Sequence, residues 1–141
     1  MVAFNKFNAF TEHAFEKVHD LSADSFVLFA CNASNAPSAS NSVLADLTPI
    51  SYTNLSSRAL TVSSSGQSSG TYKWVVADKV LTASGTVAAL RYVGIYNDTP
   101  TSPADPLIGW YDYGSEITLL DTETLTVNFD DTNGVFQAAF V

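Results

Sequence analysis

The feature that most constrains the fold is an aromatic and aliphatic stretch that runs from residue 87 to residue 120. Its first half, Val87–Asn97, is rich in β-branched and aromatic residues, which favour a strand. Residues 98–105 contain two prolines and are predicted to form an exposed loop, because proline cannot donate to a sheet ladder. The second half, Pro106–Tyr113, is predicted to pair with the first and to end at a tight turn, Gly114-Ser115. We therefore expect a hairpin at the centre of a β core.

Further strands are expected on both sides of this hairpin, separated by turns. Asp130–Gly134 ends in Asn-Gly, which readily takes positive φ and indicates a turn. The serine-rich residues 63–70 are predicted to be a flexible hairpin loop. The apolar or alternating runs that predict strands are Ser25–Cys31, Arg58–Ser63, Thr71–Ala77, Lys79–Ala83, Thr122–Phe129 and Val135–Val141. Short strands at this spacing predict a mainly β protein, an antiparallel β-sandwich or jelly-roll-like domain.

One helix is predicted near the N-terminus. Phe7, Phe10, Ala14 and Val18 recur at helical spacing, which places them on one face. We expect residues 1–22 to form a helical segment that packs on a single β-sandwich domain spanning residues 1–141. His13 and His19 are six positions apart, a poor spacing for joint metal ligation, and are predicted to be surface or rim residues.

The charge content restricts the partners that the chain can have. Charged residues make up only 14% of the 141 residues, below the roughly 25% that is typical of soluble domains. This low charge content fits a Ser/Thr/Asn-rich extracellular-type β-domain, and it also fits a surface that is largely covered by other subunits. We favour the second interpretation, because interface cores are depleted in charged residues. Six basic residues are scattered singly against fourteen acidic ones, so we expect no direct binding of nucleic acid. No apolar run is long enough to span a membrane and no signal peptide is visible, so we expect no membrane partner and synthesis in a cytoplasm.

No catalytic, cofactor or metal site is expected. Cys31 follows an apolar run and is predicted to be a buried small hydrophobe. The paired acids Asp112/Glu116 and Asp121/Glu123 are better explained as solvated turn acids than as a glycosidase pair. Asp130, Asp131 and Asn133 loosely match a calcium loop that lacks its downstream bidentate acid. The aromatic residues that could form a sugar-binding platform, but that we place in the core or a subunit interface, are Trp74, Trp110, Tyr111 and Tyr113.

Nearly the whole sequence resembles a family of small virion proteins encoded by tailed bacteriophages and prophages. The most specific matching segments are RYVGIYNDT (Arg91–Thr99) and PLIGWYDYGS (Pro106–Ser115), and FNKFNAFTEHAFEKVHDL and TLTVNFDDTNGVF also match. The resemblance implies a non-enzymatic component of the particle. Within the family we favour a capsid cement, or decoration, protein on the exterior of the head, where it would stabilise the shell by bridging major capsid subunits. A tail or neck component, or a carbohydrate-binding virion module, remains as an alternative.

Such a protein would contact the major capsid protein and itself, as a dimer or trimer. We expect the contacts to lie in the N-terminal segment and in two polar loops, although an ordinary helix face or surface loop would have the same sequence. The residues expected to contact a partner are Phe4, Phe7, Ser34, Asn35, Pro37, Asn41, Thr99, Pro100, Pro103 and Asp105.

Overall fold

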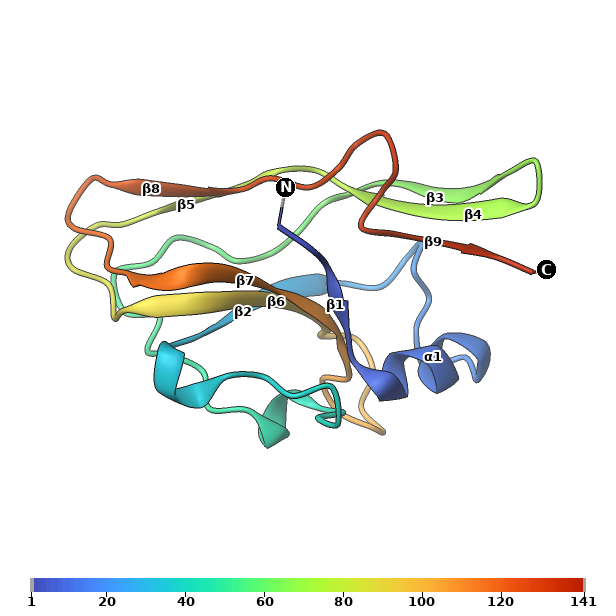
Figure 1. Cartoon of the computed structure of the whole chain (residues 1–141), viewed down its shortest axis with the longest axis horizontal. Coiled ribbons are helices and arrows are strands. Elements are labelled where there is room, and N and C mark those ends of the chain that lie inside the picture. The colour runs from blue at the N-terminus through green and yellow to red at the C-terminus, as the bar shows by residue number, and fades with distance from the viewer. Residues whose placement is uncertain (1, 141) are drawn as a thin grey trace.

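The computed structural model describes residues 2–140, so Met1 and Val141, which belong to the predicted first and last segments, lie outside the described residues. The chain is mainly β and antiparallel with a single short α-helix near the N-terminus, which confirms the predicted β-sandwich-like fold class (Figure 1). The elements in chain order are β1 (Asn5–Lys6), α1 (Asn8–Phe15), β2 (Phe26–Cys31), η1 (Ala33–Asn35), η2 (Leu44–Asp46), β3 (Val62–Ser68), β4 (Thr71–Val76), β5 (Lys79–Thr82), β6 (Leu90–Asn97), β7 (Leu107–Ile117), β8 (Thr124–Val127) and β9 (Phe136–Ala139).

The predicted central hairpin is confirmed as β6–β7, which forms the middle of a four-stranded sheet in the order β1-β7-β6-β2. The predicted turn at Gly114-Ser115 was wrong, because β7 continues to Ile117, which pairs with Leu90. Gly114 has φ +96°, a conformation that glycine adopts without a Cβ clash, and the strand bulges between Asp112 and Ile117, where its pairing with β6 shifts register, instead of turning back.

A second layer lies above this sheet in Figure 1 and consists of two smaller sheets, β3-β4-β9 and β5-β8. The main hydrophobic core fills the space between the layers. Phe26 of β2 and Trp74 of β4 meet there edge to face, with ring centroids 4.8 Å apart. The indole Nε1 of Trp74 donates a hydrogen bond of 2.9 Å to the carbonyl oxygen of Leu21, so its polar atom is satisfied although the side chain is fully buried.

The opposite face of the four-stranded sheet is buried as well. Side chains alternate along β2, so Leu28 points into the main core and Phe29 into a second core on the other face. The second core comprises Phe7, Phe29, Cys31, Tyr92, Tyr96 and Leu107. Leu44 and Leu47, from the segment that contains η2, cover it. The prediction that Cys31 is a buried small hydrophobe is confirmed, with 0% of the residue exposed.

Two strand predictions need correction. Most of the serine-rich segment is not a loop but strand β3, which pairs along β4, and only Ser69 and Gly70 turn the chain, both with positive φ. Residues 58–61 precede that strand and are not part of it. They instead protect the edge of β2, since Leu28 N–H donates to the carbonyl of Arg58 and Leu60 N–H donates to the carbonyl of Phe26.

The helix is shorter than the predicted apolar stripe. It ends at Phe15, and Lys17 takes a left-handed conformation with φ +63°, which turns the chain back. Val18 therefore lies beyond the helix, and Ala14 is exposed. Of the four predicted stripe residues only Phe7 and Phe10 are buried, and Phe7 precedes the first helical residue.

Candidate functional site

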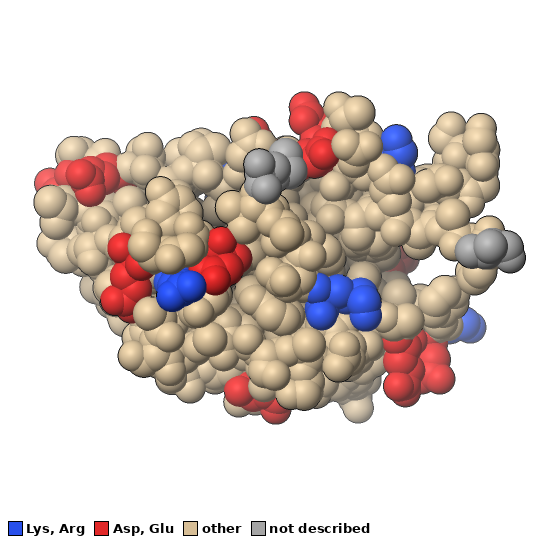
Figure 2. All heavy atoms as spheres, viewed as in Figure 1, with Lys and Arg blue, Asp and Glu red and all other residues tan. Residues whose placement is uncertain are grey.

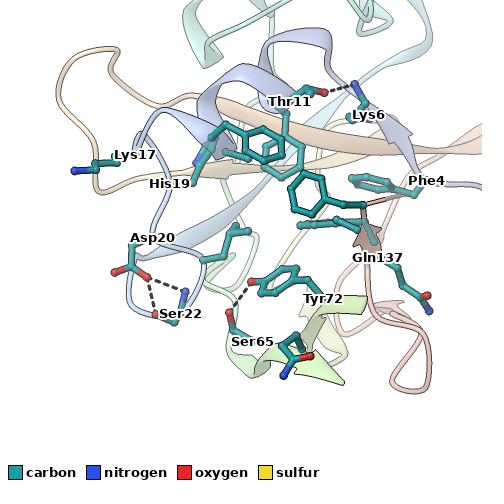
Figure 3. Close-up of a pocket in the computed structure, with 18 of the residues that line it drawn as sticks. Phe4, Lys6, Thr11, Lys17, His19, Asp20, Ser22, Ser65, Tyr72 and Gln137 are labelled. Atoms are coloured by element: carbon teal, nitrogen blue, oxygen red, sulfur yellow. Dashed lines mark hydrogen bonds between the residues drawn. The ribbon is translucent and has the colours of Figure 1, made fainter. Parts of the chain in front are cut away.

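A large groove, which we call the α1–β9 groove, lies between α1 and the β3-β4-β9 sheet. Its volume is about 1150 Å³. Figure 3 shows that aromatic side chains from the N-terminal segment, from β4 and from the last strand converge on it. Along its floor Phe10 meets Phe136 edge to face at 5.2 Å, and Phe4 stacks on Phe136 at 6.4 Å. The groove is therefore an apolar surface built from segments that are far apart in the sequence.

Two exposed phenylalanines stand at the mouth of the α1–β9 groove. Phe15 is 67% exposed and Phe140 is 88% exposed, and their ring centroids are 5.9 Å apart. Single exposed apolar residues are ordinary, but a pair beside an apolar groove forms a contiguous patch, and such patches mark interaction sites. The charged residues that line the groove are few and of both signs: Lys6, Lys17 and Asp20.

His19 lies at the inner end of this groove, and the prediction that it is a surface or rim residue was wrong. Only 8% of it is exposed, because the reversal of the chain after the helix carries it against β6. Its Nδ1 lies 3.1 Å from the Nδ2 of Asn97, which in turn donates to a carboxylate oxygen of Asp24 at 2.6 Å. The other ring nitrogen, Nε2, is buried without a hydrogen-bond partner among the described residues.

The burial of His19 controls its protonation. Its pKa is lowered from 6.5 to about 4, mainly by removal from water and to a smaller extent by the neighbouring His13, whose ring centroid is 5.9 Å away, whereas Asp24 acts in the opposite direction. His19 is therefore a neutral imidazole at neutral pH. No group of three or more His, Cys, Asp or Glu side chains within residues 2–140 is arranged to hold a metal ion.

Two of the residues expected to contact a partner are enclosed by their own chain. Phe7 is 0% exposed because it packs on Trp110 at 4.5 Å and on Phe29 at 6.3 Å. Pro37 is buried as well. In the described chain neither side chain offers exposed surface to a partner. Phe4 is half-buried and lies on the floor of the α1–β9 groove, where it also contacts Tyr111 at 5.6 Å.

The other expected contact residues lie on two loops that the structure brings together. The amide of Leu44 donates to the carbonyl of Asp105 at 2.9 Å, and the amide of Leu107 donates to the carbonyl of Ser42 at 3.0 Å. Ser34 and Thr99 are exposed, and the remaining members of the set, Asn35, Asn41, Pro100, Pro103 and Asp105, are half-buried. Thr99 uses its hydroxyl oxygen to accept a hydrogen bond from the amide of Ser25, so it also fixes the loop.

Four of the acidic residues considered for catalysis or calcium form hydrogen bonds or an ion pair in the local structure. Asp112 forms a two-point ion pair with Arg91, at 2.8 and 3.0 Å, which lowers the pKa of that carboxyl. Glu116 accepts from the amide of Ala33, and Glu123 accepts from the amide of Leu120. Asp130 accepts from the amides of Thr132 and Asn133 within the predicted turn. Each of these carboxylates stabilises a turn, a loop or a strand.

Of the four aromatic residues considered for sugar binding, only Tyr111 and Tyr113 line a common groove. Trp74 is fully buried, and Trp110 and Tyr111 are half-buried, whereas Tyr113 is 54% exposed. Tyr113 and Tyr111 line a smaller groove of about 440 Å³ together with Arg91 of β6 and Thr126 of β8. The four side chains therefore do not form a joint platform.

The sequence interpretation missed the exposed half of the α1–β9 groove. Phe15 lies outside the helical stripe, and Phe136 and Phe140 were assigned only to a final strand. No protein-family model matches the chain, and neither the curated proteins nor the solved structures give a match. No helix of the described residues is long and apolar enough to cross a membrane.

Proposed function

We propose that this chain is a structural component of a tailed-bacteriophage virion. Within that class we propose a capsid cement protein that sits on the exterior of the head and bridges major capsid subunits. The resemblance of Arg91–Thr99 and Pro106–Ser115 to small virion proteins is the reason for choosing the phage particle. A tail or neck position is the alternative.

The observation that carries the proposal is the scarcity of charge on a surface that also exposes apolar side chains. Figure 2 shows isolated red and blue groups separated by broad uncharged areas on the face in view. Interface cores are depleted in charged residues relative to ordinary protein surface, whereas aromatic residues are enriched there. Phe15 and Phe140 expose aromatic rings on such a surface. These features support a protein that is covered by neighbouring subunits when it works.

The paired loops suggest how such a protein would hold a shell. Residues 38–44 and 105–107 are tied to each other by backbone hydrogen bonds, and Asn8 N–H donates to the carbonyl of Ala39. They form one surface whose shape is set by the fold, so binding costs little ordering entropy. A cement protein binds only the assembled shell, and therefore stabilises that state by mass action. Several modest contacts to adjacent subunits add up through effective concentration.

The number of copies per particle tests this proposal. Purified virions of a phage that encodes the chain would be analysed by quantitative mass spectrometry against the major capsid protein as the internal standard. We expect a copy number near parity with the capsid subunit, since a cement protein occupies equivalent sites over the whole head. A copy number as low as that of a single ring would place the protein at the tail or neck. Absence from purified virions would refute a structural role in the particle.

A further inference from the structure

The last strand, β9, leaves one backbone edge without a strand partner. The sheet order is β3-β4-β9, so β9 pairs with β4 on one side, and no other strand of residues 2–140 pairs with its outer side. Figure 1 shows β9 lying over α1. Residues of both elements line the α1–β9 groove. Unpaired strand edges present rows of free N–H and C=O groups that readily pair with another chain. Proteins usually protect such edges with charge, with proline or with a covering segment.

The β9 edge has none of the sequence protections that prevent such pairing. Residues 134–140 read GVFQAAF and contain no charged residue and no proline. The neighbouring residues 62–72, which form β3, its turn and the start of β4, are also uncharged. Gln137, Ala138 and Ala139 are exposed, and small side chains allow close approach of a second backbone.

The distribution of charge selects a second copy of this chain as the occupant. The net charge is −8, so two copies repel each other wherever their acidic faces meet. The region around β9 is poor in charge, with Lys73 of β4 opposite Gln137, and it is a place where two copies can touch while bringing few carboxylates together. Three charged residues of mixed sign line the groove, and they do not give it a net negative charge. They are Lys6, Lys17 and Asp20.

The exposed aromatic area is of the size that such a contact requires. A phenylalanine or similar ring buries of order 150–250 Å², so Phe15 and Phe140, at 67% and 88% exposed, offer together about 300 Å². A stable interface buries about 800 Å² on each partner. Two side chains therefore supply over a third of that area, before the walls of the groove and the strand edge are counted.

We propose that β9 pairs antiparallel with β9 of a second copy across a two-fold axis, and that Phe15 and Phe140 of each copy are covered in that contact. A contact that uses the same patch on both copies closes after two subunits, as in the common two-fold dimers. Ala138 lies within the exposed run 137–140, and we place the two-fold axis beside it, so that the antiparallel pairing brings the two copies of Ala138 close together. The proposal holds whether or not the chain is a virion component.

Charge substitution at Ala138 tests the pairing. Ala138→Glu and Ala138→Lys each place two like charges across the axis, whereas a mixture of the two proteins places opposite charges there. Sedimentation equilibrium of the wild-type chain at micromolar concentration should give twice the monomer mass of 15.1 kDa. Each variant alone should weaken dimerisation by at least about a hundredfold, and mixing them should restore it.

A matched pair of control variants is provided by Val80, which is 50% exposed on β5 at the end of the molecule away from β9 (Figure 1). Val80→Glu and Val80→Lys should remain dimeric, singly and mixed. Circular dichroism of all four variants checks that they fold. A monomeric or trimeric wild type would overturn the proposal, as would Ala138 variants that stay dimeric or a mixture that stays monomeric.

Discussion

One buried side chain, His19, should contribute a large part of the acid sensitivity of the folded state. Its imidazole is neutral in the folded protein because burial lowers its pKa from 6.5 to about 4. In the unfolded chain the same group takes up a proton near its ordinary pKa. Between these two values the unfolded state binds more protons than the folded state, so the free energy of unfolding decreases as the pH falls through this window.

The size of the effect follows from the two pKa values. One pKa unit corresponds to about 1.4 kcal/mol, so the fall from 6.5 to about 4 is worth about 3 kcal/mol. This contribution to the free energy of unfolding is fully present above 6.5, the pKa of the group in the unfolded chain. It is lost progressively as the pH falls towards about 4. It is a large share of the roughly 5–15 kcal/mol by which domains are usually stable.

The substitution His19→Gln removes the titrating group and keeps a polar side chain of similar reach. Urea unfolding of both proteins at about pH 7 and about pH 4.5 gives the loss of stability over that interval for each. We expect the wild type to lose about 2 kcal/mol more than the variant, since carboxylates elsewhere contribute equally to both. The test compares how much the free energy of unfolding decreases between the two pH values. A variant that is less stable than the wild type at about pH 7 therefore does not affect the result. Equal losses in the two proteins would refute the assignment of a neutral buried His19.

Two further predictions concern the second core. A Cβ on Gly94 would lie 2.2 Å from Cζ of Phe29, so Gly94→Ala should lower the free energy of unfolding by about 1–3 kcal/mol, whereas Gly66→Ala, with nothing within 4 Å, should change it by less than about 0.5 kcal/mol. Denaturation curves of Gly94→Ala and Gly66→Ala that coincide would contradict this prediction. Burial raises the pKa of the Cys31 thiol to about 11, so a thiol reagent should modify it far more slowly in the native protein than in denaturant, and equal rates would refute its enclosure.

The sequence predicts the fold class because its strongest signals are local. The hairpin β6–β7 is formed by two apolar runs joined by a proline-containing loop, and its two strands pair as expected. The buried strand β2 is also bounded by polar residues on both sides. In such segments hydrophobic pattern and turn composition agree, and tertiary packing does not have to override them.

The errors occur where a distant partner decides the outcome. The serines of β3 have no apolar alternation, and they are a strand because β4 pairs with them from Ser64 to Ser68 and the hydroxyl of Tyr72 lies 2.6 Å from that of Ser65. His19 is buried because a left-handed residue turns the chain towards Asn97, which is 78 positions away. Neither event leaves a periodic signal in the sequence.

The candidate site was predictable only in part, for the same reason. Phe4 and Phe7 have the same side chain three positions apart, yet Phe7 is enclosed in the second core and Phe4 lines the groove. The groove itself is formed by the helix, by β4 and by β9, so no single window of sequence contains it. The aromatic content indicated a protein rich in packing surface, but not which rings would remain exposed.

Burial of the central sheet on both faces determines how this protein can present itself to others. In many antiparallel domains one face of a sheet remains open and can be shaped into a broad recognition platform. Here every residue from Tyr92 to Asn97 is buried, and β2 is enclosed in the same way except for a half-buried Val27. Recognition is thereby left to strand edges, loops and the outer layer, where substitutions can change partners while the interior stays intact.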